Sequence, residues 1–277
     1  MSAPIGSVRS DLSVSRLSLF WLGSLWLAML HWRWTHLPTG QGYDPTPLWL
    51  NRFQQVSVVW LALPLLLMLA SLVGALRLGR PRPQDRQAPL ARAWVAYLAM
   101  HLGAFLWMVP WAWLSPLAQQ YAYAVWVGAC LWPVRQYLRW RFQPGWWKWS
   151  LSAFGLAILG ALIYAWVFHP APSVNGAVPL LLRANLTQKV FWLIQLCLLT
   201  PVLEESWYRG LLSGPRPTRL ILSALAFGLV HADPSALPQL IWLGLVFGWA
   251  RWGGGLPAAV LAHALWNGTV AVYLLGA

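Results

Sequence analysis

The sequence predicts an all-α protein, a polytopic bundle of about eight or nine transmembrane helices. Hydrophobic residues make up 59% of the 277 residues and charged residues only 9%, whereas a soluble domain has roughly 25% charged residues. The apolar residues gather in segments near the ~20 residues that a spanning helix needs. Tryptophan is abundant, with 23 copies, and often lies near segment ends, where its ring prefers the headgroup level of a bilayer.

Nine apolar segments follow one another along the chain. They cover residues 17–34, 55–77, 93–114, 119–138, 150–168, 188–212, 217–232, 236–252 and 256–275. The first resembles the core of a signal peptide, but no small-residue cleavage site lies within reach, so we expect it to remain as a membrane helix. The segment 217–232 is short for a span, and its apolar character extends as far as Leu237.

Along this series, turns that are rich in basic residues alternate with turns that contain few of them. Two arginines precede the first segment, five surround the turn after the second, and four basic residues lie between the fourth and fifth. By the positive-inside rule, these turns and the N-terminus face the cytoplasm, in a multi-pass protein of the cytoplasmic membrane. The net charge of +13 is therefore spread between spans and does not form the basic face of a nucleic-acid-binding protein.

A proline-containing stretch, residues 170–185, is the clearest boundary in the chain. We expect residues 1–185 to be membrane helices whose role no motif assigns. Residues 186–277 form the second region, because polar residues interrupt three of its four apolar segments. This region also holds Gly244 and Gly248, a pair of small residues four apart that allows a neighbouring helix to approach closely.

The only two glutamates of the chain, Glu204 and Glu205, are adjacent and lie within an apolar segment. A carboxylate at that depth costs at least roughly 2.5–3.5 kcal/mol on insertion scales, so an intramembrane glutamate indicates a functional site. Glu205 and Arg209 are four residues apart, share a helix face and can pair. Glu204 is turned about 100° away and can face another helix.

Two histidines and an asparagine lie in the apolar segments that follow. His231 is four residues after Phe227, and His263 is four residues before Asn267, so each pair shares one face of a helix. At 1.5 Å per residue, Glu204, His231 and His263 lie roughly 12–18 Å from the same membrane surface. Each residue has a purely structural alternative, an ion pair for Glu205 and Arg209 or hydrogen bonds between helices for the others.

Three motifs resemble those of the CAAX-protease and bacteriocin-processing family of intramembrane glutamate proteases. Glu-Glu-Ser-Trp-Tyr-Arg (204–209) resembles the family's EExxxR motif, Phe-Gly-Leu-Val-His (227–231) its FxxxH motif, and His-Ala-Leu-Trp-Asn (263–267) its HxxxN motif. Their order, spacing and membrane setting agree with the family. The resemblance covers roughly the last third of the chain.

The resemblance implies an intramembrane endopeptidase that cleaves membrane-tethered proteins or peptides, near a C-terminal tail, without a metal or other cofactor. Glu204 is then the base that activates water, and His231 helps to hold the water. His263 and Asn267 supply hydrogen bonds to the developing oxyanion, as peptide hydrolysis requires. Glu205, Arg209 and Phe227 support these groups. The expected partners are the lipid bilayer and a membrane-anchored substrate, whose identity no residue selects.

Three other functions fit some of the same residues. One glutamate and two histidines are also a catalytic zinc set, which would make the protein a zinc-dependent intramembrane metalloprotease, although no HExxH motif occurs. Buried Glu, His and Arg side chains suit the proton relay of a proton-coupled transporter, but they cluster in one half of the chain and no broken-helix repeat is evident. The third alternative is a noncatalytic, immunity-type membrane protein on the protease scaffold.

Overall fold

The structure, a computed structural model, describes residues 115–168, 184–213, 216–231 and 236–276, together with Leu182 and five helical residues between 93 and 101. Every secondary-structure element in these residues is a helix, as the composition predicts. The predicted segments 17–34 and 55–77 lie outside the described residues, as does most of segment 93–114. The total of eight or nine spanning helices therefore stays a prediction.

The chain divides into two compact units, residues 1–115 and 116–277. All of the helices described below belong to the second unit, which therefore includes helices from both sides of the stretch 170–185. The division predicted at residue 185 separates two regions by role, and it stays a prediction.

The second unit begins with α5, Pro116–Leu131, which continues into a short 3₁₀ helix, η1, Trp132–Tyr137. An irregular connection follows, and α6 then extends over Trp146–Phe168. These helices confirm the predicted segments 119–138 and 150–168, with small shifts of the ends.

One long helix carries the two glutamates and changes its type along its length. It begins where the Asn185 side chain accepts a hydrogen bond from the Gln188 backbone N–H, while the Gln188 side chain accepts one from the Asn185 N–H. This reciprocal capping sets the first residue of the helix. Its successive parts are α8 (Leu186–Ile194), the π-helix η2 (Gln195–Leu199), α9 (Thr200–Glu205) and the π-helix η3 (Ser206–Leu212).

Three helices complete the unit: α10 (Pro217–Val230), α11 (Leu237–Gly254) and α12 (Leu256–Gly276). Gly255 alone separates α11 from α12, with a φ of 83° that favours glycine. Its N–H donates to the Arg251 carbonyl and closes α11. A side chain at position 255 would collide with the Arg141 carbonyl of the connection between η1 and α6. The two helices can therefore follow each other directly and pack together.

Helices α10 and α11 approach each other closely at the two small residues that the sequence indicates. A Cβ atom added to Gly244 would lie 2.8 Å from the Cα of Ala224 on α10, closer than real Cβ contacts occur. One added to Gly248 would collide with the Leu220 side chain. The predicted close approach at Gly244 and Gly248 is thus confirmed, and it brings the two helices together next to the polar residues of the unit.

Among the residues that the structure describes, three helices are long and apolar enough to cross a membrane, by length and composition: Trp146–Phe168, Leu186–Leu212 and Leu256–Leu275. Helix α10 is apolar but has only 14 residues, about 21 Å at 1.5 Å per residue, which is less than the ~30 Å of a hydrocarbon layer. Helix α11 contains Gln239, Arg251 and four glycines, and it also falls outside this group. The predicted segments 217–232 and 236–252 are therefore helices, but not among the three that qualify as spans.

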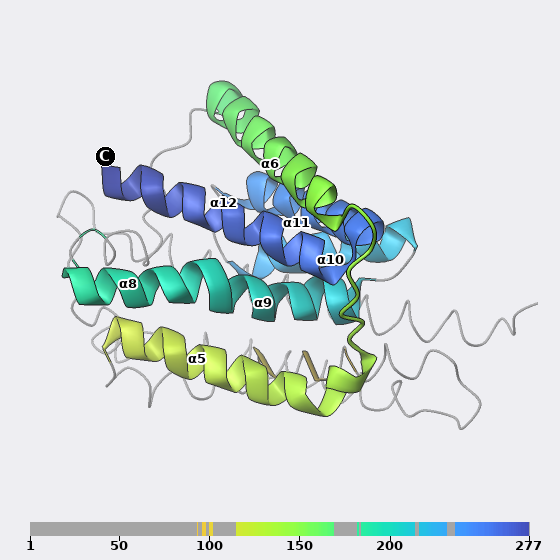
Figure 1. Ribbon diagram of the computed structural model, residues 1–277, viewed down its shortest axis with the longest axis horizontal. Helices are drawn as coiled ribbons and strands as arrows, with labels where there is room; N and C mark the ends of the chain where they lie inside the picture. The colour runs from red at the N-terminus through yellow and green to blue at the C-terminus, as the bar shows by residue number, and fades with distance from the viewer. Residues whose placement is uncertain are drawn as a thin grey trace, which may run out of the picture. The chain divides into compact units, whose positions relative to one another are not determined.

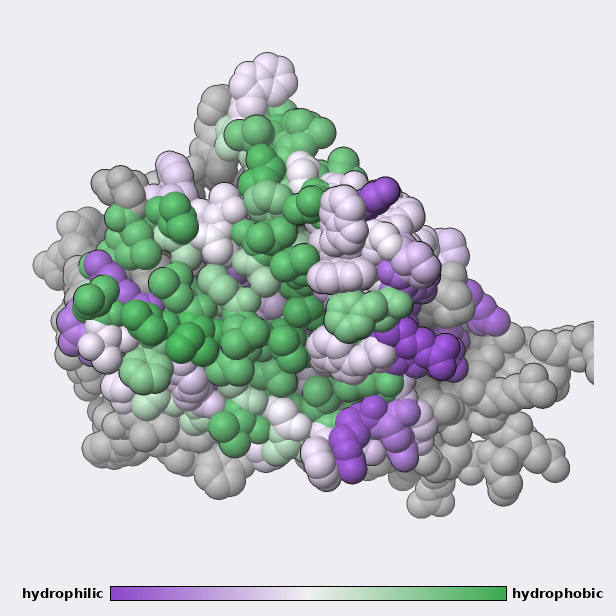
Figure 2. All heavy atoms as spheres, in the orientation of Figure 1, coloured by the Kyte–Doolittle hydropathy of each residue, from purple (hydrophilic) through white to green (hydrophobic). Residues whose placement is uncertain are grey.

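The long helix lies between α5 on one side and α12 on the other, while α6 packs against α11 and α12 (Figure 1). Much of the face in Figure 2 is apolar, and hydrophilic side chains gather at its right-hand end. Side chains such as Trp166, Leu186 and Val272 are more than 70% exposed. A soluble protein rarely exposes so much contiguous apolar surface. This surface and the span-length helices indicate an integral membrane protein.

Candidate active site

The two glutamates end α9, immediately before the π-helix η3. They differ sharply in exposure, because the Glu205 side chain is 0% exposed and the Glu204 side chain is 27% exposed. Consecutive residues on a helix point about 100° apart, which is why one carboxylate enters the packed interior and the other remains at its margin. Glu204 is therefore the carboxylate that water can reach.

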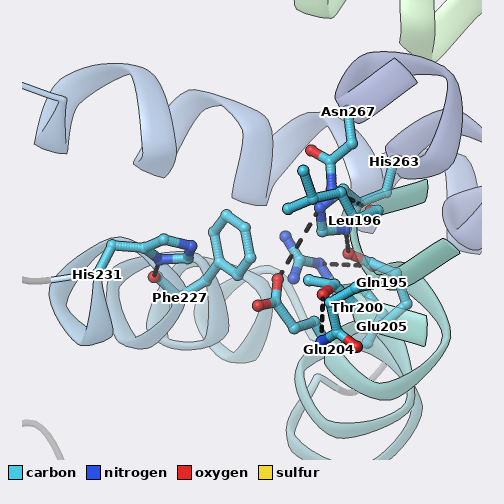
Figure 3. Close-up of polar contacts among 10 residues, drawn as sticks. Gln195, Leu196, Thr200, Glu204, Glu205, Phe227, His231, His263 and Asn267 are labelled. Carbon is cyan, nitrogen blue, oxygen red and sulfur yellow. Dashed lines mark hydrogen bonds and ion pairs between the residues drawn. The ribbon is translucent and has the colours of Figure 1, made fainter. Parts of the chain in front are cut away.

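Glu205 joins the long helix to α12. Its Oε2 lies 3.2 Å from Nε of Arg209, the ion pair that the spacing predicts, and its Oε1 lies 2.8 Å from Nδ1 of His263 (Figure 3). A carboxylate only accepts hydrogen bonds, so Nδ1 of His263 carries the proton and donates it. The bond to Glu205 therefore fixes both the orientation and the tautomer of the His263 ring.

Arg209 is completely buried, and its charge is balanced by that of Glu205. Among the described residues its Nη1 and Nη2 atoms make no hydrogen bond. Its guanidinium carbon instead lies 4.5 Å from the ring centre of Phe227, with Tyr208 and Phe247 also in range. Aromatic faces attract a desolvated guanidinium. Ion pair and rings together hold this cation in place behind Glu205.

His263 faces Glu204 with its other nitrogen. The Nε2 atom of His263 lies 3.9 Å from Oε2 of Glu204, a distance too long for a direct hydrogen bond. The depths estimated from the sequence place these two residues at one level, and the structure brings them together. The carboxylate of Glu204 and the Nε2 atom of His263 therefore face each other across this gap.

Two phenylalanines confine the His263 ring. Phe247 of α11 stacks on it with the ring centres 4.9 Å apart and the planes inclined by 18°, and Phe227 of α10 stands edge-on at 5.9 Å. The Ser223 hydroxyl donates to the Tyr208 carbonyl over 2.6 Å, which ties α10 to η3 one turn before Phe227. The histidine ring is thus packed against phenylalanines of both α10 and α11.

His231 lies apart from this group. The Phe227 ring lies between His231 and the glutamates, with its centre 4.8 Å from that of His231 (Figure 3). Nδ1 of His231 lies 2.7 Å from the Phe227 carbonyl, which can only accept, so Nδ1 donates and Nε2 remains an acceptor in the neutral ring. Among the described residues His231 forms no ion pair with either glutamate.

Asn267 lies one turn beyond His263 on α12, as the spacing predicts, but its amide points to the backbone of the long helix. Its Nδ2 donates to the Leu196 carbonyl over 2.8 Å (Figure 3). Leu196 belongs to the π-helix η2. The asparagine thus joins α12 to the same helix that carries both glutamates, at a second point.

The structure brings Glu204, Glu205, Arg209, His263 and Phe227 into one cluster, with Asn267 beside it and His231 behind Phe227. Sequence reasoning missed four contributors: Phe247, Ser223, the Leu196 carbonyl and the bond between Glu205 and His263. A signal existed for Ser223, because residues 223, 227 and 231 recur every four positions on one face of α10. The contact between Glu205 and His263 had none, because it depends on how two helices cross.

The described residues contain no group of three or more His, Cys, Asp and Glu side chains that could hold a metal ion. Zinc needs three or four such ligands at about 2.0–2.3 Å. His231, one of the three ligands that the zinc alternative requires, lies behind Phe227, whose ring separates it from His263. The arrangement of these residues gives the zinc alternative no support.

Comparison with known proteins agrees with the three motifs. No curated protein and no solved structure matches the chain. Residues 186–269 match a protein family described as type II CAAX prenyl endopeptidase Rce1-like. The matched residues begin with α8, include every residue of the cluster, and end within α12. The resemblance predicted from the motifs is confirmed over this region, and the match indicates a CAAX-type intramembrane protease.

Proposed function

We propose that this protein hydrolyses a peptide bond in a membrane-tethered protein or peptide, near a C-terminal tail, with water activated by Glu204. The observation that carries the proposal is the facing pair of Glu204 and His263, 3.9 Å apart, with Glu205 bonded to the far side of the histidine. A base and an electrophilic donor at one point are the two groups that hydrolysis of an amide requires.

Glu204 acts as the general base. Its side chain is 27% exposed, so water reaches it, while most of its surroundings are protein. It takes a proton from the attacking water and later gives a proton to the amine that leaves. A positioned base of this kind contributes typically 10²–10⁴-fold to the rate. The family match and the adjacent buried Glu205 support Glu204 in this role.

His263 stabilises the oxyanion as an imidazolium. Because its Nδ1 proton is committed to Glu205, an N–H on Nε2 exists only in the protonated ring. With Arg209 and His263 positive and both glutamates negative, the cluster has no net charge. It also has none when the histidine has passed its proton to Glu204. A proton can therefore move within the cluster without leaving an uncompensated charge in a buried site.

Asn267 supplies a second donor to the oxyanion, and His231 helps to hold the water. The role of His231 rests on the motif. In this structure Phe227 lies between His231 and His263. For His231 and Glu204 to bind the same water, the side chain of either Phe227 or His231 must change its rotamer. Phe227, Phe247 and Arg209 hold the reacting groups and keep bulk water out of the interior.

The test compares cleavage by the parent and by Glu204→Gln in proteoliposomes, with substrates found by comparing the membrane proteomes of cells with and without the protein. The amide keeps the shape of the side chain and cannot act as a base, so cleavage should disappear while insertion and folding persist. Retention of more than a small fraction of the rate would refute Glu204 as the base. Loss of the parent's activity in a chelator would favour the zinc alternative.

A proteome unchanged by the protein, with no cleavage of any tethered peptide, would favour the transporter or the noncatalytic alternative. A transporter would then have to move protons or solute across the vesicle membrane in a manner that depends on Glu204.

A further inference from the structure

The hydrogen-bond register of the long helix shifts just before Pro201. The N–H of Thr200 donates to the carbonyl of Gln195, five residues back, where an α-helix would place the carbonyl of Leu196. In this shifted register, the backbone nitrogen that would donate to the Leu196 carbonyl is that of residue 201. Proline has no N–H. The backbone of the long helix therefore provides no donor in that register for the Leu196 carbonyl.

Asn267 of α12 donates a hydrogen bond to this carbonyl, from its Nδ2 atom to the Leu196 oxygen over 2.8 Å. Because a carbonyl only accepts, the side-chain amide must present its NH₂ group to it, which fixes the amide orientation. One of the two N–H groups is thus engaged and the second is held in a defined direction, one turn from His263. Pro201 is itself buried, so no water at the surface replaces this bond.

We propose that Pro201 is a positioning residue that acts on Asn267 through the Leu196 carbonyl. By withholding a backbone donor, it leaves an acceptor that holds the Asn267 amide in place beside His263. The inference rests on the proposed function, in which Asn267 donates to the oxyanion. A donor fixed before the reaction stabilises the developing charge more than one that must first reorient.

Pro201 could instead act only by bending the long helix, in which case its effect would be independent of Asn267. The two explanations differ in coupling. Pro201→Ala restores an N–H that competes for the Leu196 carbonyl and releases the Asn267 amide. Pro257→Ala is the matched control, because Pro257 is also buried but lies in the first turn of α12, where a missing N–H breaks no helical bond.

In a cleavage assay in proteoliposomes, Pro201→Ala should lower kcat by roughly tenfold or more, the size typical of a lost orienting contact. KM should stay within about twofold, because the effect is on the transition state. Pro257→Ala should behave as the parent. In the Asn267→Ala background Pro201→Ala should cause no further loss, and losses that multiply independently would overturn the proposal.

A double-mutant cycle measured by thermal unfolding tests the same link without a cleavage assay. Asn267→Ala should lower the Tm of the parent because it leaves the Leu196 carbonyl without a donor, and it should lower the Tm less when residue 201 is alanine. Equal effects in the two backgrounds would overturn the link between Pro201 and Asn267. If the two substitutions are coupled in their effect on Tm but the parent cleaves no substrate, the proposed peptidase activity is refuted and the link between Pro201 and Asn267 stands. Failure of the proposed activity can therefore be told apart from failure of this link.

A third comparison remains decisive if Pro201→Ala does not fold. Thr269 lies two residues beyond Asn267 on α12, and its hydroxyl donates only within its own helix, to the Leu265 carbonyl. Asn267→Ala should lower the Tm clearly more than Thr269→Ala. An equal or smaller decrease would show that the bond to Leu196 does not hold Asn267, and it would overturn the proposal.

Discussion

The Nδ1 atom of His263 lies 2.8 Å from Oε1 of Glu205, so the two adjacent glutamates meet the same histidine from opposite sides. Glu205 is buried and also pairs with Arg209. Glu204 is partly exposed, and its Oε2 atom lies 3.9 Å from Nε2 of the histidine. One carboxylate is therefore committed to structure and orientation, and the other is available for chemistry. Two adjacent residues of one type have different surroundings because they point about 100° apart.

Removing Arg209 should harm folding more than chemistry. Arg209→Ala leaves the buried Glu205 without its cation, and breaking a buried pair costs about 3–5 kcal/mol. Glu205→Gln should be milder, because its amide oxygen can still accept the His263 proton and Arg209 keeps its three aromatic neighbours. Thermal unfolding in detergent checks both variants. Arg216→Ala, at an exposed arginine before α10, is the control, and an Arg209→Ala protein as stable as this control would contradict the prediction.

Loss of either proposed oxyanion donor should slow the chemical step. We expect His263→Ala and Asn267→Ala each to lower kcat by roughly 10²–10³, the usual effect of losing one such donor, with little change in KM. Steady-state kinetics with a tethered peptide gives both constants, and Thr269→Ala on the same helix is the control. A variant that changes KM alone would show that its residue binds the substrate and does not stabilise the transition state.

The packing of α10 on α11 should be sensitive to a single methyl group. Gly244→Ala places a Cβ 2.8 Å from Ala224, so the helices must separate, at a cost of about 1–3 kcal/mol for overpacking. Because Phe227 and Phe247 lie on these two helices, the rate should fall as well. Gly155→Ala on α6 is the matched control, since nothing lies within 4 Å of its added methyl. Equal Tm values for the two variants would contradict this prediction.

Much of this site follows from the sequence because it depends on local periodicity. The positions of six helices follow from apolar runs, and the ion pair of Glu205 with Arg209 follows from their spacing of four residues. The predicted closeness of Gly244 to a neighbouring helix needs only the absence of a side chain. These predictions hold because a helix fixes the geometry of residues within a few turns of one another.

The remaining contacts depend on how separate helices cross, and periodicity does not determine that. Phe227 stands between His231 and the glutamates, so the structure separates a histidine that the motif would place beside Glu204. The π-turn before Pro201 shifts the hydrogen-bond register of the long helix, and the Leu196 carbonyl within this turn accepts a hydrogen bond from Asn267. The proline at position 201 indicates a break in the helical hydrogen bonds, but it does not show that the break takes the form of a π-turn.

The last prediction concerns access to the site. Sequence depths place Glu204 and His263 roughly 12–14 Å below the same membrane surface, and the basic turn between the long helix and α10 indicates that this is the cytoplasmic side. A soluble peptide should therefore be a poor substrate. The same peptide tethered by a lipid or a membrane helix should be cleaved much faster, because the tether raises its effective concentration at the bilayer. Equal rates for the two forms would contradict entry from the membrane.

The side from which the site is reached can be determined by labelling single cysteines. Thr187 lies at the start of α8, and Thr218 lies in the first turn of α10, shortly after the other end of the long helix; both are exposed. In a background without Cys130 and Cys197, Thr218→Cys should react with an impermeant reagent only from the cytoplasm and Thr187→Cys only from outside. Because the helix between them, Leu186–Leu212, has 27 residues and is apolar enough to cross a membrane, reaction of both from one side would show that it does not span the membrane. The reverse pattern would move the site towards the exterior, so that the tail it cleaves would have to be exported before it is cut.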